Sequence, residues 1–153
     1  GLMVKDNEPF LIEYNVRMGD PECQTILPKL ETDLTDIILA CCKNKLNEIE
    51  IKWNKYKSMC IVLCSKGYPE NYNKNVLIDN VDKVIINQKN FFFHAGTIIK
   101  DQQIFATGGR VLNFVSLSDS FLDARNKIIN NLNILNWNGG FYRKDIGYKV
   151  IDK

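Results

Sequence analysis

The residues best suited to bind a metal ion beside an anionic substrate are Glu13, Asn15 and Arg17, which alternate along the chain. Successive side chains of a strand point to opposite faces, so these three would share one face at roughly 7 Å intervals. Carboxylate and amide oxygens suit Mg²⁺, which usually takes one or two protein ligands plus substrate phosphates. A guanidinium can hold a carboxylate or a phosphate through two parallel hydrogen bonds. The spacing therefore indicates a metal and anion site.

A strand over residues 10–18 is predicted to position these side chains. A Gly-Asp-Pro turn signal closes it at 19–21, and an apolar start with a charged turn in residues 1–8 predicts a β-hairpin partner. The opposite face of the strand would carry four apolar side chains, Ile12, Tyr14, Val16 and Met18. The alternative at this point is an edge strand whose polar face is only solvated and salt-bridged.

Composition places the chain among ordinary globular proteins. It has 153 residues, of which 45% are hydrophobic and 25% charged. A net charge of +2 gives no electrostatic case for nucleic acid or a membrane surface as a partner. No stretch approaches the roughly 18 uncharged apolar residues of a membrane span, and no N-terminal signal pattern is present.

The cysteines indicate thiols in a reducing compartment. The sequence has five, an odd number, with no CxxC and no histidine at zinc-site spacing. Small buried thiols in a reducing cytosol explain this pattern, so a cytoplasmic protein is expected.

Two helices are expected, and the fold class is α+β. Apolar residues recur every three or four positions over 30–41, with Thr32 or Asp33 as the N-cap, and this helix is expected to pack beneath the strand that carries Glu13. The same period returns over 118–133, with Ser118 or Ser120 as the N-cap.

The remaining patterns predict strands. A continuous apolar run at 59–65 is typical of a strand buried on both faces. A hairpin turn is expected at 100–103, and the glycine pair at 108–109 favours a bulge or tight turn before Arg110. The other runs with strand character are 47–56, 76–78, 84–86, 91–94, 104–106 and 111–115.

Residues 13–22, Glu-Tyr-Asn-Val-Arg-Met-Gly-Asp-Pro-Glu, closely resemble the E-[FY]-N-x-R-x-G-D-P-E segment of the phosphoribosylamine–glycine ligases, ATP-grasp enzymes of purine synthesis. The resemblance recurs downstream in order. Its further segments are a strand ending in Gly67-Tyr68-Pro69, Phe-His-Ala-Gly-Thr at 93–97, Thr-Gly-Gly-Arg-Val-Leu at 107–112 and Phe-Tyr-Arg-Lys-Asp-Ile-Gly at 141–147. Glu70 and Asn75 stand where the family commonly has glycine, which affects the local loop shape.

The resemblance implies a domain organisation. Residues 1–46 would be the C-terminal end of an ATP-grasp domain. Residues 47–153 would be a small β-rich C-terminal domain with a packing helix, as in biotin-carboxylase-like relatives. The chain would then be a C-terminal fragment, inactive alone, whose missing N-terminal part holds most of the nucleotide site.

The resemblance also implies an activity, the ATP-dependent ligation of glycine to 5-phosphoribosylamine through a glycyl phosphate. Glu13 and Asn15 would be ligands of Mg²⁺ or Mn²⁺. The catalytic residue would be Arg17, and substrates would be bound by Arg17, Gly19, Asp20, Gly67, Tyr68 and Pro69. Asp20 would receive the glycine ammonium, and the partners would be ATP, glycine, phosphoribosylamine and the missing part of the protein.

Four questions stay open. His94, the single histidine, is either a hydrogen-bonded structural residue or a catalytic one. Arg110 either reaches a phosphate or pairs with an acidic side chain. The parent protein is either this ligase or another purine-type ATP-grasp ligase, although the segments at 93–97 and 107–112 argue against the latter. From a different class, the chain could be a non-catalytic binding module derived from such a ligase.

Overall fold

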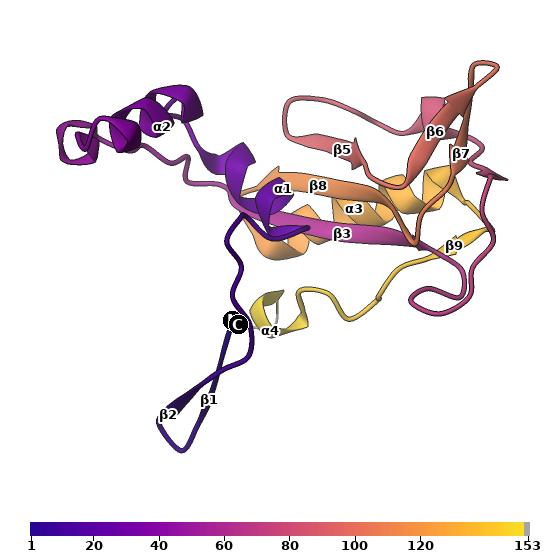
Figure 1. Cartoon of the computed structure of the whole chain (residues 1–153). Coiled ribbons are helices and arrows are strands. Elements are labelled where there is room, and N and C mark those ends of the chain that lie inside the picture. Colours follow the sequence, from indigo (N-terminus) through magenta and orange to yellow (C-terminus); the bar gives the residue numbers. More distant parts are fainter. Residues whose placement is uncertain (152–153) are drawn as a thin grey trace.

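The computed structural model describes residues 1–151 and has a mixed helix-and-sheet fold (Figure 1). None of the helices in this range is long and apolar enough to cross a membrane. The strands are β1 (Leu2–Lys5), β2 (Glu8–Leu11), β3 (Lys57–Ser65), β4 (Val76–Leu77), β5 (Asn90–His94), β6 (Thr97–Lys100), β7 (Gln103–Ala106), β8 (Arg110–Ser118) and β9 (Gly140–Phe141). The helices are α1 (Glu22–Ile26), α2 (Leu34–Cys42), α3 (Phe121–Leu135) and α4 (Tyr148–Ile151), with 3-10 turns at Leu27–Lys29, Leu46–Glu48 and Val81–Lys83.

The centre of the fold is an antiparallel sheet in the order β5-β8-β3-β9. Alternate residues of β3 are fully buried on one face, and those between them are half-buried on the other. The prediction of a strand covered on both faces is therefore confirmed. Two smaller sheets, β4-β7-β6 and β1-β2, complete the strand structure.

Helix α3 covers one face of the central sheet (Figure 1). The prediction of this helix is confirmed, with Ser120 as the N-cap whose side chain accepts from the Asp123 amide at 3.1 Å. Burial of apolar side chains is the main favourable term in such packing. The buried side chains shared by α3, β3 and β8 are Ile61, Leu63, Leu112, Phe114, Ala124, Ile128, Leu132 and Leu135.

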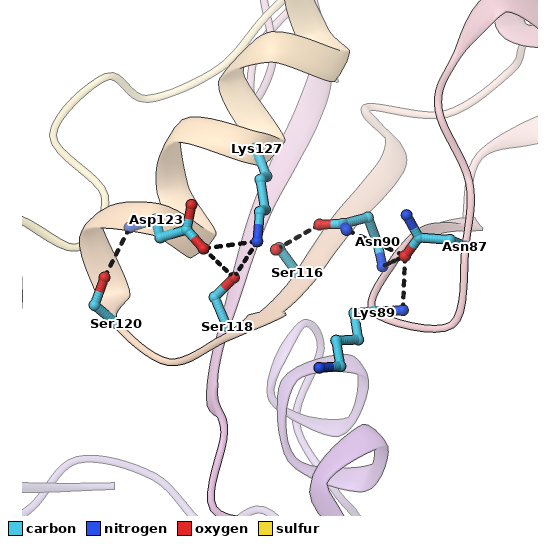
Figure 2. A network of polar contacts seen from close by, with 8 residues as sticks. All are labelled: Asn87, Lys89, Asn90, Ser116, Ser118, Ser120, Asp123 and Lys127. Carbon is cyan, nitrogen blue, oxygen red and sulfur yellow. Dashed lines mark hydrogen bonds and ion pairs between the residues drawn. The ribbon is translucent and has the colours of Figure 1, made fainter.

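A polar network ties the start of α3 to the end of β8 (Figure 2). Buried Ser118 donates to Asp123 Oδ2 at 2.7 Å, and Lys127 Nζ donates to the same carboxylate oxygen at 2.6 Å. The hydrogen bonds from Lys127 and from Ser118 lower the pKa of Asp123 below its ordinary value of 3.8. Next to this group, Ser116 of β8 donates to Asn90 of β5 at 2.7 Å (Figure 2).

The predicted hairpin at 100–103 is confirmed by β6 and β7, whose two turn residues, Asp101 and Gln102, both have positive φ, as a type I′ turn requires. The strand predicted at 84–86 is wrong. The Asn131 amide takes the place of a partner strand there, accepting from the Ile85 N–H at 3.1 Å and donating to the Ile85 C=O at 3.0 Å.

The strand predicted over 10–18 is confirmed only as far as Leu11, where it pairs with β1. Residues 12–18 form no ladder, and the side chains expected on an apolar face are open, with Tyr14 82% and Val16 97% exposed. The β1–β2 hairpin provides no third strand for this segment to pair with.

Helix α2 confirms the predicted element and its N-cap, since Asp33 accepts from the Thr35 amide at 2.7 Å. Its expected position beneath the Glu13 segment is wrong. It projects away from the β1–β2 hairpin (Figure 1), and its apolar residues Ile38 and Leu39 are about half exposed. The strand predicted at 47–56 is also wrong, because only a single bridge, Leu30 to Trp53, forms there.

Replacing Asp123 with Asn is expected to lower the free energy of unfolding at neutral pH and to flatten its dependence on acid. Because the pKa of Asp123 is lowered in the folded state, its contribution is complete above its ordinary value of 3.8 and is lost as the pH falls through the folded value. Urea unfolding of both proteins from pH 7 to pH 2 measures this. The exposed Asp119, changed to Asn, is the control, and identical pH profiles for the Asp123 variant and the wild type would contradict the network's role.

Candidate functional site

Glu13, Asn15 and Arg17 form a line of side-chain hydrogen bonds. Asn15 Nδ2 donates to Glu13 Oε1 at 2.9 Å, and Arg17 Nη1 donates to Asn15 Oδ1 at 3.3 Å. Arg17 Nη1 also donates to the Met18 carbonyl at 3.1 Å. These contacts between residues two apart place the three side chains on one side of the chain, as the alternation predicted, although the segment belongs to no sheet.

The donor atoms at the start of this line fit a hard divalent cation. Glu13 offers a carboxylate, and Asn15 offers an amide oxygen that carries one long hydrogen bond from Arg17. Among residues 1–151 no cluster of three or more His, Cys, Asp or Glu side chains could hold a metal ion. Glu13 and Asn15 would therefore leave the remaining coordination positions to water and substrate oxygens, which is the usual pattern for Mg²⁺.

The line ends at a cleft of about 860 Å³ between the segment around α1 and the edge of β5 and β8. The cleft brings together Arg17, Gly19 and Asp20, which the sequence assigned to one site, with His94 and Arg110, whose roles were left open. The remaining lining residues are Met18, Cys23, Gln24, Leu27, Pro28, Phe91 and Phe93.

A β-bulge turns Arg110 toward this cleft. Leu63 pairs with Leu112, but the next residue of β3, Cys64, pairs with Arg110, so Val111 is the extra residue of the bulge. Regular alternation would place Arg110 on the α3 face with Leu112. The bulge moves it to the other face, beside Cys64, which is how bulges re-aim a side chain next to a site.

Gly96 and Gly108 allow two loops next to this bulge to approach closely. Gly96 N–H donates to the Arg110 carbonyl at 2.8 Å, and a Cβ on Gly96 would lie 2.5 Å from Gly108 Cα. No side chain fits there, so the segments 93–97 and 107–112 meet through glycine backbone. The chain bends at Gly108 and Gly109, which confirms the predicted turn before Arg110, whereas the bulge lies after Arg110, at Val111.

Arg110 binds Asp20, 90 residues earlier in the chain, through two contacts. Its Nη2 lies 3.0 Å from Asp20 Oδ2, and its Nη1 donates to the Asp20 main-chain carbonyl at 3.1 Å. Asp20 Oδ1 accepts from Gln24 Nε2 at 2.8 Å. Of the two roles left open for Arg110, the structure shows pairing with an acidic side chain.

His94 is held as a structural strand residue would be. Its Nδ1 lies 2.9 Å from Thr97 Oγ1, and its ring meets the Phe92 ring edge-on at 5.3 Å. The hydroxyl and the aromatic ring together orient the imidazole in the lining of the cleft.

Gly67, Tyr68 and Pro69 lie apart from the cleft. Tyr68 and Pro69 border a separate cavity of about 380 Å³ that also contacts Pro21 and the half-buried face of β3. Gly67 has a φ of +98°, which favours glycine, and the Tyr68 ring packs on Gly109. These residues support the Arg110 turn from its other side, and the structure does not group them with Arg17.

Sequence reasoning missed two buried polar side chains, Gln24 on α1 and Asn113 on β8, where α1 contacts the face of the central sheet opposite α3. Gln24 anchors Asp20, while its own Oε1 is buried with no hydrogen bond within residues 1–151. Asn113 is 1% exposed, and neither of its amide atoms has a partner in that range. For Asn113 the available signal was a polar residue inside an otherwise apolar strand pattern, since burying an unpaired amide is costly.

Comparisons with known proteins agree with one another. The family described as phosphoribosylglycinamide synthetase, C domain, matches residues 58–149. A phosphoribosylamine–glycine ligase of Brucella melitensis is 37% identical over 153 residues, covering 100% of this chain and 36% of the relative. A chloroplastic phosphoribosylamine–glycine ligase of Arabidopsis thaliana is 40% identical over 157 residues, covering 99% of this chain and 29% of the relative.

A solved structure adds a spatial match. The phosphoribosylamine–glycine ligase of Thermotoga maritima superposes with a TM-score of 0.69 at 26% identity, over 95% of this chain and 35% of that one. The chain thus spans about a third of the length of the relatives it matches.

The thiols of this chain are expected to differ sharply in reactivity. Burial beneath α1 raises the pKa of the Cys60 thiol to about 12, so almost none of it is thiolate at pH 8. Exposed Cys41 and Cys42 should react with iodoacetamide under native conditions, and Cys60 should react only after unfolding. Peptide mass spectrometry after timed labelling measures this. Native labelling of Cys60 as fast as that of Cys41 would contradict the coverage of β3 by α1.

Proposed function

Because this chain belongs to the phosphoribosylamine–glycine ligase family, we propose that it is part of an ATP-dependent enzyme that joins glycine to 5-phosphoribosylamine. In the proposed reaction the glycine carboxylate attacks the γ-phosphate of ATP, which releases ADP and forms glycyl phosphate. The amine of phosphoribosylamine then attacks the glycyl carbonyl carbon, and phosphate leaves. The product is glycinamide ribonucleotide, a purine precursor.

The proposal includes two domains within the chain. Residues 1–46 form the end of an ATP-grasp domain and residues 47–153 form the C-terminal domain. The match of the family's C domain to residues 58–149 supports the second part of this division. The chain alone is expected to be inactive, because the sequence contains no glycine-rich phosphate loop for ATP.

The observation that carries the proposal is the hydrogen-bonded line from Glu13 to Arg17, which ends at the cleft. Glu13 and Asn15 would hold Mg²⁺ or Mn²⁺, which when bound neutralises the phosphate oxygens. Arg17 would present its guanidinium to the acyl phosphate, where a planar pair of N–H donors matches two oxygens. Preorganised positive charge of this kind is the main contribution that such a site can make to phosphoryl transfer.

The remaining residues shape the substrate pocket. Gly19 and Asp20 form the wall of the cleft next to Arg17, and the Phe91 and Phe93 rings form an apolar wall that limits water around the acyl phosphate. The loop of Gly67, Tyr68 and Pro69 borders a separate cavity, so its part in the proposed site is to support the backbone before Arg110, through the packing of the Tyr68 ring on Gly109.

Changing Glu13 to Ala in the complete ligase is expected to reduce ligation by roughly 100-fold or more, since it removes one of the two metal ligands proposed in this chain. Folding should be unaffected because Glu13 is exposed and belongs to no sheet. Glycine- and phosphoribosylamine-dependent ADP release measures the effect. Glu8→Ala, an exposed carboxylate on the β1–β2 hairpin that precedes Glu13, is the control. Wild-type turnover of the Glu13 variant would refute the metal role.

A further inference from the structure

We propose that Arg110 is a positioning residue for the ligation, which holds the Glu13–Asp20 segment against the edge of the central sheet so that Arg17 faces the cleft. The effect of Arg110 on ligation rests on the proposed function. The contact itself is independent of that function, because it joins two parts of this chain.

The segment that carries Glu13, Asn15 and Arg17 needs an external anchor. Residues 12–18 make no ladder, and their side chains are exposed. Segments with few buried contacts and solvent-exposed backbone open with little free-energy cost. Groups that must meet a transition state need to be held within fractions of an ångström, so such a segment cannot position Arg17 by itself.

Arg110 is built as that anchor. It begins β8, whose following residues Val111 and Leu112 are completely buried. Its carbonyl accepts from Gly96, and the bulge directs its side chain to the α1 face. The close approach of Gly96 and Gly108 therefore allows the backbone path that directs the Arg110 guanidinium toward the cleft.

The contact with Asp20 is suited to holding a backbone. One Arg110 nitrogen binds the Asp20 carboxylate, and the other binds the carbonyl of the same residue, which fixes both the side chain and the chain path. A planar fork can make both contacts at once, whereas a lysine ammonium is a point charge on a flexible stem. This predicts that Lys at position 110 replaces Arg only in part.

Asp20 is engaged on both of its carboxylate oxygens. Oδ2 is paired with Arg110, and Oδ1 accepts from Gln24. In this arrangement Asp20 is held in place by Arg110 of β8, and Gly19 and Arg17, which precede it in the chain, are held with it. The proposal therefore assigns Asp20 to positioning, in place of the binding of the glycine ammonium suggested by the family resemblance.

The first test measures order at the start of α1 in this chain. The amide groups of Cys23 and Thr25 donate to Gly19 and Pro21, so their hydrogen exchange reports whether the anchored segment stays in place. In Arg110→Gln these two amides should exchange roughly tenfold faster, and in Arg110→Lys by a smaller factor. Exchange in α3 should stay unchanged in both variants.

Lys45→Gln is the control, because Lys45 makes an exposed ion pair with Glu48 and lines neither the cleft nor the cavity that borders Pro21. It should leave the Cys23 and Thr25 amides at the wild-type rate. Wild-type exchange of these amides in Arg110→Gln would overturn the proposal, as would a uniform rise that includes α3, which indicates global destabilisation.

The second test is kinetic and uses the complete ligase. A misplaced Arg17 should lower kcat and raise the KM for glycine, each by roughly tenfold, with recovery of part of both in Arg110→Lys. A merely structural role would reduce the amount of active enzyme and leave the KM for glycine unchanged, and that result would overturn the proposal. If the wild-type ligase shows no glycine-dependent ADP release, the proposed function fails, while the exchange experiment still decides the role of Arg110.

Discussion

The ion pair between Arg110 and Asp20 is the contact on which the site depends. It joins a segment without regular structure to the most buried strand of the fold, across 90 residues of chain. Opposite charges that are about 40% exposed contribute little to stability by themselves. The value of this pair lies in geometry, because the second hydrogen bond to the Asp20 carbonyl fixes where the chain runs.

Several features of the fold converge on that pair. Strands β3 and β8 form a paired ladder, and α3 buries one of its faces. The bulge opposite Cys64 directs Arg110 to the other face. The close approach of Gly96 and Gly108 makes the bulge possible. The segments at 93–97 and 107–112, which most specifically resemble the ligase family, are thus explained by backbone geometry around one arginine. Neither segment needs a direct contact with substrate to be important.

Sequence patterns correctly predicted the elements that depend on interactions between residues close together in the chain. The buried strand β3, the capped helix α3 and the tight turn of β6 and β7 follow from periodicity, capping and turn chemistry. Predictions that required a tertiary partner were wrong at four places, one of them the strand expected at 47–56, where only a single bridge forms. Residues 12–18 found no neighbouring strand, residues 84–86 were paired by an asparagine side chain, and α2 projected outward.

In the candidate site, too, the local features were predictable and the contacts between distant residues were not. The shared side of Glu13, Asn15 and Arg17 was predictable, because it depends only on an extended backbone. The pairing of Arg110 with Asp20 was not, since nothing in a sequence says which of many acidic residues an arginine 90 positions away will meet. Within residues 1–151, Gln24 Oε1 of α1 and both amide atoms of Asn113 of β8 are buried without a hydrogen bond, so polar groups are present where apolar packing would be expected.

A double-mutant cycle on Asp20 and Arg110 measures whether these two residues stabilise the fold together. The free energies of unfolding of wild type, Asp20→Asn, Arg110→Gln and the double variant give the coupling between the two residues. We expect the double variant to be less destabilised than the sum of the single variants, with a coupling of about 1 kcal/mol for a half-exposed pair with a second hydrogen bond. Strict additivity would contradict the claim that Arg110 acts through Asp20.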